Sequence, residues 1–325
     1  MKFLKFSLIG LLILALAVAY LLASMALKFQ VGMGPAILLS VLGIALLVAA
    51  LVTHTQRLLS TGAVLLPLVA TLIWWNGIAP SNDRIWAPEL ARSVSADISG
   101  SVVTLHNVRD FTWRSQTDFD ENWETHSYDL KKMNSLDVAL SYWGIDKIAH
   151  VLISFGFEDG EHVVFSVEIR KELGESFSEL GGLFKQFELS LIAATEDDIL
   201  FLRTNARDPR EDVYLYPINV SPPAREALFM SYVQLANQLA EEPYWYNTIT
   251  ANCTSVIYRL VRSFNPDLGF DPRFILSGGL PEFLVEEGML AWEEPLGDYR
   301  TRATISAKAQ AIQPGESYSD VIRTE

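Results

Sequence analysis

Three long runs without a charged residue occupy the first eighty residues of this chain. They cover residues 6–26, 35–53 and 62–79. Each run is long enough to cross the hydrocarbon layer of a bilayer as a helix. The first run is too long for the apolar core of a signal peptide. Buried helices of a soluble core are the alternative, but three successive uncharged runs exceed what such a core usually holds. We therefore predict three N-terminal transmembrane helices.

Basic residues in the short loops predict the orientation of these helices. Lys2, Lys5 and Arg57 fall on one side of the predicted spans, and Lys28 falls on the other. Because cytoplasmic loops carry more Lys and Arg, the N-terminus is predicted in the cytoplasm and everything after Ala79 outside it. This predicts a multi-pass inner-membrane protein with its C-terminal domain in the periplasm. We divide the chain into a membrane anchor at 1–80, a periplasmic domain at 81–300 and a polar tail at 301–325, which we expect to be loose.

Charge and cysteine content limit the function of the domain. The chain has a net charge of −14, and its first eighty residues contain no acidic side chain, so the negative charge belongs to the remainder. An acidic domain argues against nucleic acid as a partner. The single cysteine cannot form an internal disulfide. In an oxidising compartment a purely structural free thiol is a liability.

The single cysteine, Cys253, lies at the predicted start of a helix. Apolar residues follow it at a period near 3.6, at Val256, Ile257, Leu260, Val261 and Phe264. Asn265-Pro266 ends the helix. Asn252 is a good N-cap, which places Cys253 at the first helical position. The positive end of the helix dipole there lowers the pKa of a thiol. The alternative is a small, buried structural cysteine.

Two alternating runs at residues 147–157 and 161–170 predict an antiparallel hairpin around Glu158-Asp159-Gly160. A two-residue loop would set Val151 against Glu168. A three-residue loop with Gly160 in the left-handed region pairs apolar residues instead: Val151 with Val167, Ile153 with Phe165, and Phe155 with Val163. Because a slip of one residue exchanges the two faces of a strand, the apolar pattern selects the second register.

The selected register brings a histidine and a carboxylate together on the other face. It sets His150 opposite Glu168, with Cβ atoms about 5 Å apart, and Arg170 shares their face. The same register places His162 about 20 Å from His150, too far to act with it. Residues 199–203 and 213–218 are predicted to be short strands.

Cys253, His150 and Glu168 would form a nucleophile, base and orienter set. Cys253 would attack a carbonyl or ester, and His150 would hold the thiol proton and donate it to the leaving group. Glu168 would fix the imidazole tautomer. Asn252 and the N–H groups at the helix start would bind substrate or its oxyanion, and Arg170 a phosphate or carboxylate. The alternative for His150 and Glu168 is an ordinary surface pair. We find no metal-ligand cluster and predict neither metal nor cofactor.

Short motifs after the third run resemble a known family. They are His106-Asn107-Val108-Arg109, Ser141-Tyr142-Trp143-Gly144, Ala149-His150, Ser154-Phe155, Phe165-Ser166-Val167-Glu168-Ile169-Arg170-Lys171, Arg203-Thr204-Asn205, Trp245-Tyr246-Asn247 and Asn252-Cys253-Thr254. A histidine on a strand before a cysteine on a helix resembles the permuted papain-like arrangement of lecithin–retinol-type lipid acyltransferases, whereas papain places its cysteine first. More closely, the stretch from about Leu105 to Gly288 resembles the Lnb-type periplasmic domain of a bacterial lipoprotein N-acyltransferase family.

This resemblance implies a fold class and an activity. The expected fold is α+β, with three transmembrane helices before a permuted papain-like periplasmic domain that contains an antiparallel sheet. The expected activity is transfer of a fatty acyl chain from a phospholipid, through a thioester on Cys253, to an amine of a lipoprotein or another acceptor. A cysteine peptidase or amidase of the envelope, and a non-catalytic envelope binding module, are the alternatives.

Overall fold

The computed structural model describes residues 2–52, 57–292 and 296–324, and the chain forms two compact units. The first unit contains residues 1–81 together with the segment 177–187. The second contains residues 82–176 and 188–325. The predicted second span ends at Thr53, which lies outside the described residues.

The first unit contains three helices, which match the three uncharged runs. They are α1 (Lys2–Gln30), α2 (Met33–Val52) and α3 (Arg57–Gly77). Within α1, Gly10–Gln30 is long and apolar enough to cross a membrane, whereas the apolar stretches Met33–Ala49 and Gly62–Gly77 are shorter. The Tyr20 hydroxyl donates to the carbonyl of Val64 at 2.7 Å, which ties α1 to α3. One membrane-crossing helix is therefore supported by length and composition.

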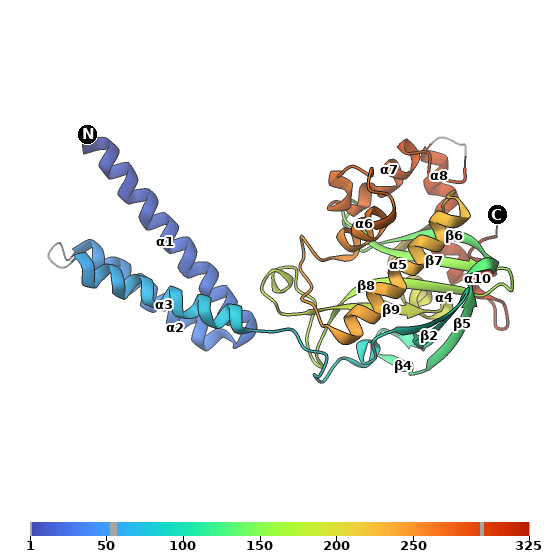
Figure 1. The fold of residues 1–325 in the computed structure, drawn as a ribbon, viewed down its shortest axis with the longest axis horizontal. Coiled ribbons are helices and arrows are strands. Elements are labelled where there is room, and N and C mark those ends of the chain that lie inside the picture. Colours follow the sequence, from blue (N-terminus) through green and yellow to red (C-terminus); the bar gives the residue numbers. More distant parts are fainter. Residues whose placement is uncertain (1, 53–56, 293–295, 325) are drawn as a thin grey trace. The chain divides into compact units, whose positions relative to one another are not determined.

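The second unit is built on a sheet of eight strands (Figure 1). Seven of them lie in the order β1-β2-β9-β8-β7-β6-β10, and β5 pairs with β2. The strands are β1 (Ser95–Ser99), β2 (Val102–Arg109), β5 (Trp123–Asp129), β6 (Met133–Tyr142), β7 (His150–Phe157), β8 (His162–Arg170), β9 (Glu188–Ala194) and β10 (Asp212–Pro217). A separate small sheet pairs β3 (Thr112–Ser115) with β4 (Asp118–Asp120). All strand pairs are antiparallel except β2 with β9, so the mixed α+β class with an antiparallel sheet is confirmed.

The β7–β8 hairpin has the register that the apolar pattern predicted. Its pairs run Leu152↔Ser166, Ile153↔Phe165, Ser154↔Val164, Phe155↔Val163 and Gly156↔His162. Gly160 has a φ of 86°, as the three-residue loop requires. The register is fixed because Ile153, Phe155 and Phe165 are all buried against helices on one face.

Helices cover both faces of the large sheet (Figure 1). On one face lie α5 (Pro222–Glu241), α6 (Cys253–Phe264), α7 (Leu280–Glu286) and α8 (Leu296–Ala303). There Phe165 of β8 stacks on Tyr232 of α5, with ring centroids 4.8 Å apart. The other face carries α4 (Glu196–Phe201), α9 (Ser306–Gln310) and α10 (Tyr318–Val321). The result is a three-layer arrangement with the sheet in the middle.

Two sequence-based expectations about this second layer of helices are wrong. Residues 199–203, predicted as a strand, belong to α4 and the π-helical turn Leu202–Ala206. The Thr195 side chain caps α4 by accepting from the Asp198 N–H, and three acidic residues fill its first turn, which favours a helix. The tail at 301–325, expected to be loose, is packed instead, because Ile305, Tyr318 and Ile322 are buried in this layer. Residues 213–218, by contrast, coincide with β10 as predicted, to within a residue.

Candidate functional site

The start of α6 holds Cys253 at its first helical position, as predicted. The Asn252 side chain accepts from the Ser255 N–H at 2.8 Å, and the Ser255 hydroxyl accepts from the Asn252 N–H at 2.9 Å. This reciprocal capping box fixes the backbone entering the helix. The N–H groups of Cys253 and Thr254 precede the first bond within the helix, from Val256 to the Asn252 carbonyl. They are therefore donors that the helix itself does not use.

The helix start meets the sheet where two strands separate. The pairing of β7 with β8 begins at Leu152 and Ser166, so the first two residues of β7 lie beyond it. Helix α6 contacts both strands. The Cys253 sulfur is 3.7 Å from the Thr254 hydroxyl, and the Val151 N–H and the His150 side chain lie close enough to lower the pKa of the thiol. The opening between the strands thus brings the thiol and the imidazole together, although α6 packs on the face opposite His150.

His150 lies between the thiol and a carboxylate. Its Nε2 is 2.7 Å from Ser166 Oγ and 3.1 Å from Glu168 Oε1. The Ser166 hydroxyl in turn donates to Glu168 Oε1 at 2.7 Å. Because its own proton is used there, Ser166 Oγ accepts the hydrogen bond from the Nε2–H of His150. The cluster therefore runs from Cys253 through His150 to Glu168, and Ser166 and Glu168 hold the imidazole at Nε2.

The surroundings favour a charged pair at the thiol and the imidazole. Burial alone would lower the pKa of His150, but the Glu168 carboxylate and the hydrogen bonds with Cys253 and Glu168 raise it to about 9. Burial would raise the pKa of the Cys253 thiol, but His150 and the Val151 N–H lower it below its ordinary value. Burial opposes ionisation of Glu168 as well, yet His150, Arg203 and Ser166 hold its pKa well below the usual range. A thiolate beside an imidazolium is the state that these contacts support.

Arg203 supports Glu168 from behind and was not singled out from the sequence as a site residue. Its Nη2 donates to Glu168 Oε1 at 2.9 Å, and its Nη1 donates to the Ile199 carbonyl at 2.9 Å. The side chain is 3% exposed, so the guanidinium is held in one place by the π-helical turn. Within the sequence, the only signal for Arg203 was its presence in a motif shared with the family.

Arg170 and Asn252, both predicted at a substrate, have structural partners in this structure. The Arg170 guanidinium is buried, donates to the carbonyls of Leu90 and Ala91 and to Asn82, and lies 4.3 Å over the Trp86 ring. It is not part of the His150 cluster. The Asn252 side chain caps α6 and donates to the Thr248 carbonyl at 2.7 Å. Asn252 therefore positions the helix start through its side chain.

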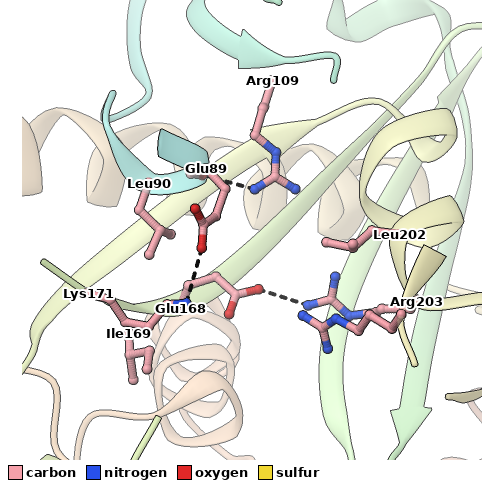
Figure 2. A pocket seen from close by; sticks show the side chains of 9 residues that line it. Glu89, Leu90, Arg109, Glu168, Ile169, Lys171, Leu202 and Arg203 are labelled. Carbon is pink, nitrogen blue, oxygen red and sulfur yellow. Dashed lines mark hydrogen bonds and ion pairs between the residues drawn. The ribbon is translucent and has the colours of Figure 1, made fainter. Parts of the chain in front are cut away.

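A small pocket lies beside Glu168 (Figure 2). It has a volume of about 70 Å³ and is lined by Glu89, Leu90, Arg109, Glu168, Ile169, Lys171, Leu202, Arg203 and Arg207. Each of its four cationic side chains is paired with a carboxylate: Arg109 with Asp198, Lys171 with Glu89, Arg203 with Glu168, and Arg207 with Glu211. Because these charges cancel, we assign no anionic ligand to the pocket.

Asp137, His162 and Glu196 form a second cluster, with ligand-type atoms within 4.8 Å of one another. Arg323 contacts both carboxylates, at 2.7 Å from Asp137 and 2.7 Å from Glu196. The guanidinium therefore already supplies the positive charge that a metal ion would bring. We interpret this cluster as a buried ion pair that fastens the C-terminal segment to the sheet.

Comparison with known proteins identifies the family of this domain. The model of the family described as the Lnb N-terminal periplasmic domain matches residues 119–300, more than half of the chain. No curated protein and no solved structure matches the chain. The matched range contains Cys253, His150, Glu168 and Arg203, and the resemblance read from the sequence is confirmed. This chain belongs to the family of the Lnb N-terminal periplasmic domain.

Proposed function

We propose that this protein is a membrane-tethered thiol acyltransferase of the periplasm. The observation that carries the proposal is the continuous contact from the Cys253 thiol through His150 to Glu168, because it joins a nucleophile, a base and an orienting carboxylate. The family and the apolar helix Gly10–Gln30 agree with an envelope protein that is anchored in a membrane. The order of the residues in the chain is that of permuted papain-like acyltransferases.

In the first half of the proposed reaction, the Cys253 thiolate attacks an ester carbonyl of a phospholipid. The carbonyl oxygen becomes an oxyanion, which the N–H groups of Cys253 and Thr254 would receive at the positive end of α6. The carbon–oxygen bond to the glycerol then breaks. The His150 imidazolium gives its proton to the departing alkoxide, leaving a lysophospholipid and an acyl thioester on Cys253.

In the second half, an amine attacks the thioester carbonyl. Neutral His150 takes the proton of the attacking amine, the carbon–sulfur bond breaks, and Cys253 leaves as a thiolate. The products are an amide on the acceptor and the enzyme in its starting state. Glu168, held by Arg203 and Ser166, stabilises the imidazolium in both halves. The proposed acceptor is the amine of a lipoprotein.

The membrane anchor gives this chemistry its donor. Three transmembrane spans, as the uncharged runs predict, would keep the domain at a surface rich in acyl esters. Tethering raises the effective concentration of the lipid donor at the active site.

The test is the mass of the peptide that contains Cys253. After incubation of the full-length protein with phospholipid and no acceptor, we expect an added acyl mass that hydroxylamine removes. Cys253→Ser and His150→Ala should each prevent it, the first by removing the nucleophile and the second by removing the base. Glu172→Gln, which alters a carboxylate paired with Arg84 outside the site, is the matched control.

Other outcomes of the same experiment would replace the proposal. A peptidyl adduct on Cys253 would favour a cysteine peptidase or amidase. No adduct, together with full cellular activity of Cys253→Ser, would favour a non-catalytic binding module. Loss of the acyl adduct only in His150→Ala and Cys253→Ser supports acyl transfer.

A further inference from the structure

The segment 177–187, which connects β8 to β9, folds as a compact turn within the first unit. The Gly181 N–H donates to Ser178 Oγ at 3.0 Å, and the Phe184 and Gln186 N–H groups both donate to the Gly181 carbonyl. A Cβ at Gly181 would collide with the Gln186 side chain, so the turn closes tightly around this glycine. The segment is therefore an ordered element with its own hydrogen bonds.

Two side chains tie this turn to the ends of α1 and α3. Gln30, the last residue of α1, donates from Nε2 to the carbonyls of Phe184 and Lys185, at 3.1 and 2.6 Å. Lys185 donates from Nζ to the carbonyls of Trp75 and Ile78, at 2.9 and 3.3 Å, where α3 ends. A lysine at the end of a helix satisfies carbonyls that have no partner within the helix. Lys185 has a φ of 53°, a conformation that a non-glycine residue holds only when its contacts fix it.

Aromatic rings reinforce the same contact. Phe184 stacks on Phe29 with centroids 5.6 Å apart, and meets the edge of Trp75 at 6.2 Å. The Lys185 ammonium lies 4.9 Å from the centre of the Trp75 ring. Aromatic side chains and a lysine gathered at the end of an apolar helix are the pattern of a membrane–water interface.

The length of α1 sets the depth of this turn. The apolar part of α1, Gly10–Gln30, has 21 residues. At 1.5 Å per residue it extends about 31 Å, which matches the hydrocarbon thickness of a bilayer. Gln30 and the turn bound to it then lie at the boundary of the hydrocarbon. Two apolar side chains of the turn, Phe177 and Leu180, are each 52% exposed.

We propose that the turn 177–187 enters the interfacial layer of the bilayer, with Phe177 and Leu180 against lipid. The partner is the lipid surface itself, because the turn is hydrogen-bonded to the end of the apolar helix α1. The inference rests on the membrane anchor and does not depend on acyl transfer.

Spin labels on single cysteines test this placement in the full-length protein. In a Cys253→Ser background, Phe177→Cys and Leu180→Cys each offer one labelling site in vesicles of phosphatidylethanolamine and phosphatidylglycerol. We measure accessibility to oxygen, which enters lipid, and to a water-soluble nickel chelate. Ile98→Cys is the matched control, since Ile98 of β1 is also 52% exposed. Leu38→Cys in α2, where the side chain is 70% exposed, is the reference for lipid.

We expect labels at 177 and 180 to favour oxygen over the nickel chelate several-fold more than the label at 98, approaching the value at 38. Equal ratios at 177, 180 and 98 would overturn the proposal. A second variant tests the attachment: Lys185→Met should make the label at 180 more mobile, because the turn loses its bonds to α3. An unchanged line shape would contradict the role given to Lys185. Because Cys253 is absent throughout, failure here leaves the proposed acyl transfer untouched.

Discussion

Replacing Glu168 with glutamine should make Cys253 a weaker nucleophile, although Glu168 does not contact the thiol. The substitution keeps the shape of the side chain and removes the negative charge that lies 3.1 Å from His150 Nε2. Without this charge, burial becomes the dominant influence on His150 and lowers its pKa below the ordinary value. His150 would then be neutral at pH 7, and Cys253 would lose its cationic partner.

The size of the effect follows from the environment of His150. Its pKa is about 9 against an ordinary 6.5, so the site favours the imidazolium by about 3 kcal/mol. The thiol would lose the part of its stabilisation that comes from the cationic form of His150. A thiol with an ordinary pKa near 8.5 is only about 3% ionised at pH 7. We therefore expect the alkylation rate at pH 7 to fall, by no more than about thirtyfold if the thiol returns to its ordinary pKa.

Iodoacetamide alkylation measures this directly, because Cys253 is the only cysteine in the chain. The rate constant is followed from pH 5 to 9 for the unmodified protein, Glu168→Gln and the control Glu172→Gln. The midpoint should lie at a lower pH in the unmodified protein and the control than in Glu168→Gln. Thermal unfolding checks that each variant is folded. A Glu168→Gln profile that superimposes on that of the unmodified protein would refute the electrostatic reasoning.

Two stability predictions concern buried polar groups away from the site. Tyr232→Phe should leave the melting temperature unchanged or raise it by a few degrees, because among the described residues its buried hydroxyl has no hydrogen-bond partner. Tyr142→Phe, which loses a bond of 2.9 Å, should lower it, and the opposite order would contradict this. Arg323→Leu should cost about 3–5 kcal/mol, because it leaves two buried carboxylates without a counter-charge. The loss of stability should be smaller at pH 5 than at pH 8, because protonation at the lower pH neutralises the unpaired carboxylates of Asp137 and Glu196. The exposed substitution Arg92→Leu is the control.

Local rules were enough to predict the two halves of the site. The hairpin register followed from Ile153, Phe155 and Phe165, because a shift of one residue would have moved each of them to the other face of its strand. The start of α6 followed from Asn252, because the capping side chain acts on an N–H three residues away. In both cases the deciding interactions join residues that are near in sequence or directly opposite in a hairpin.

The parts that the sequence did not reveal depend on contacts between distant segments. Arg203 reaches Glu168 across 35 positions, and it does so from a π-helical turn in a region whose apolar residues resemble a short strand. The Val151 N–H is free for the thiol only because β7 and β8 separate at one point. The sequence of the C-terminal tail is largely polar, yet Tyr318 and Ile322 are both buried against α4.

The burial of Arg203 argues against an ordinary surface pair as the interpretation of His150 and Glu168. A surface pair would need no third charge, since solvent would screen it and it would contribute less than about 1 kcal/mol. Here the Arg203 side chain is 3% exposed, and it donates to Oε1 of Glu168, the same oxygen that lies 3.1 Å from His150 Nε2. Burying three ionic groups is costly, and apolar residues of similar volume often give equal or greater stability. The arrangement keeps the Glu168 carboxylate ionised and fixed beside the His150 imidazole. A histidine that acts as the base for a thiol requires such a partner.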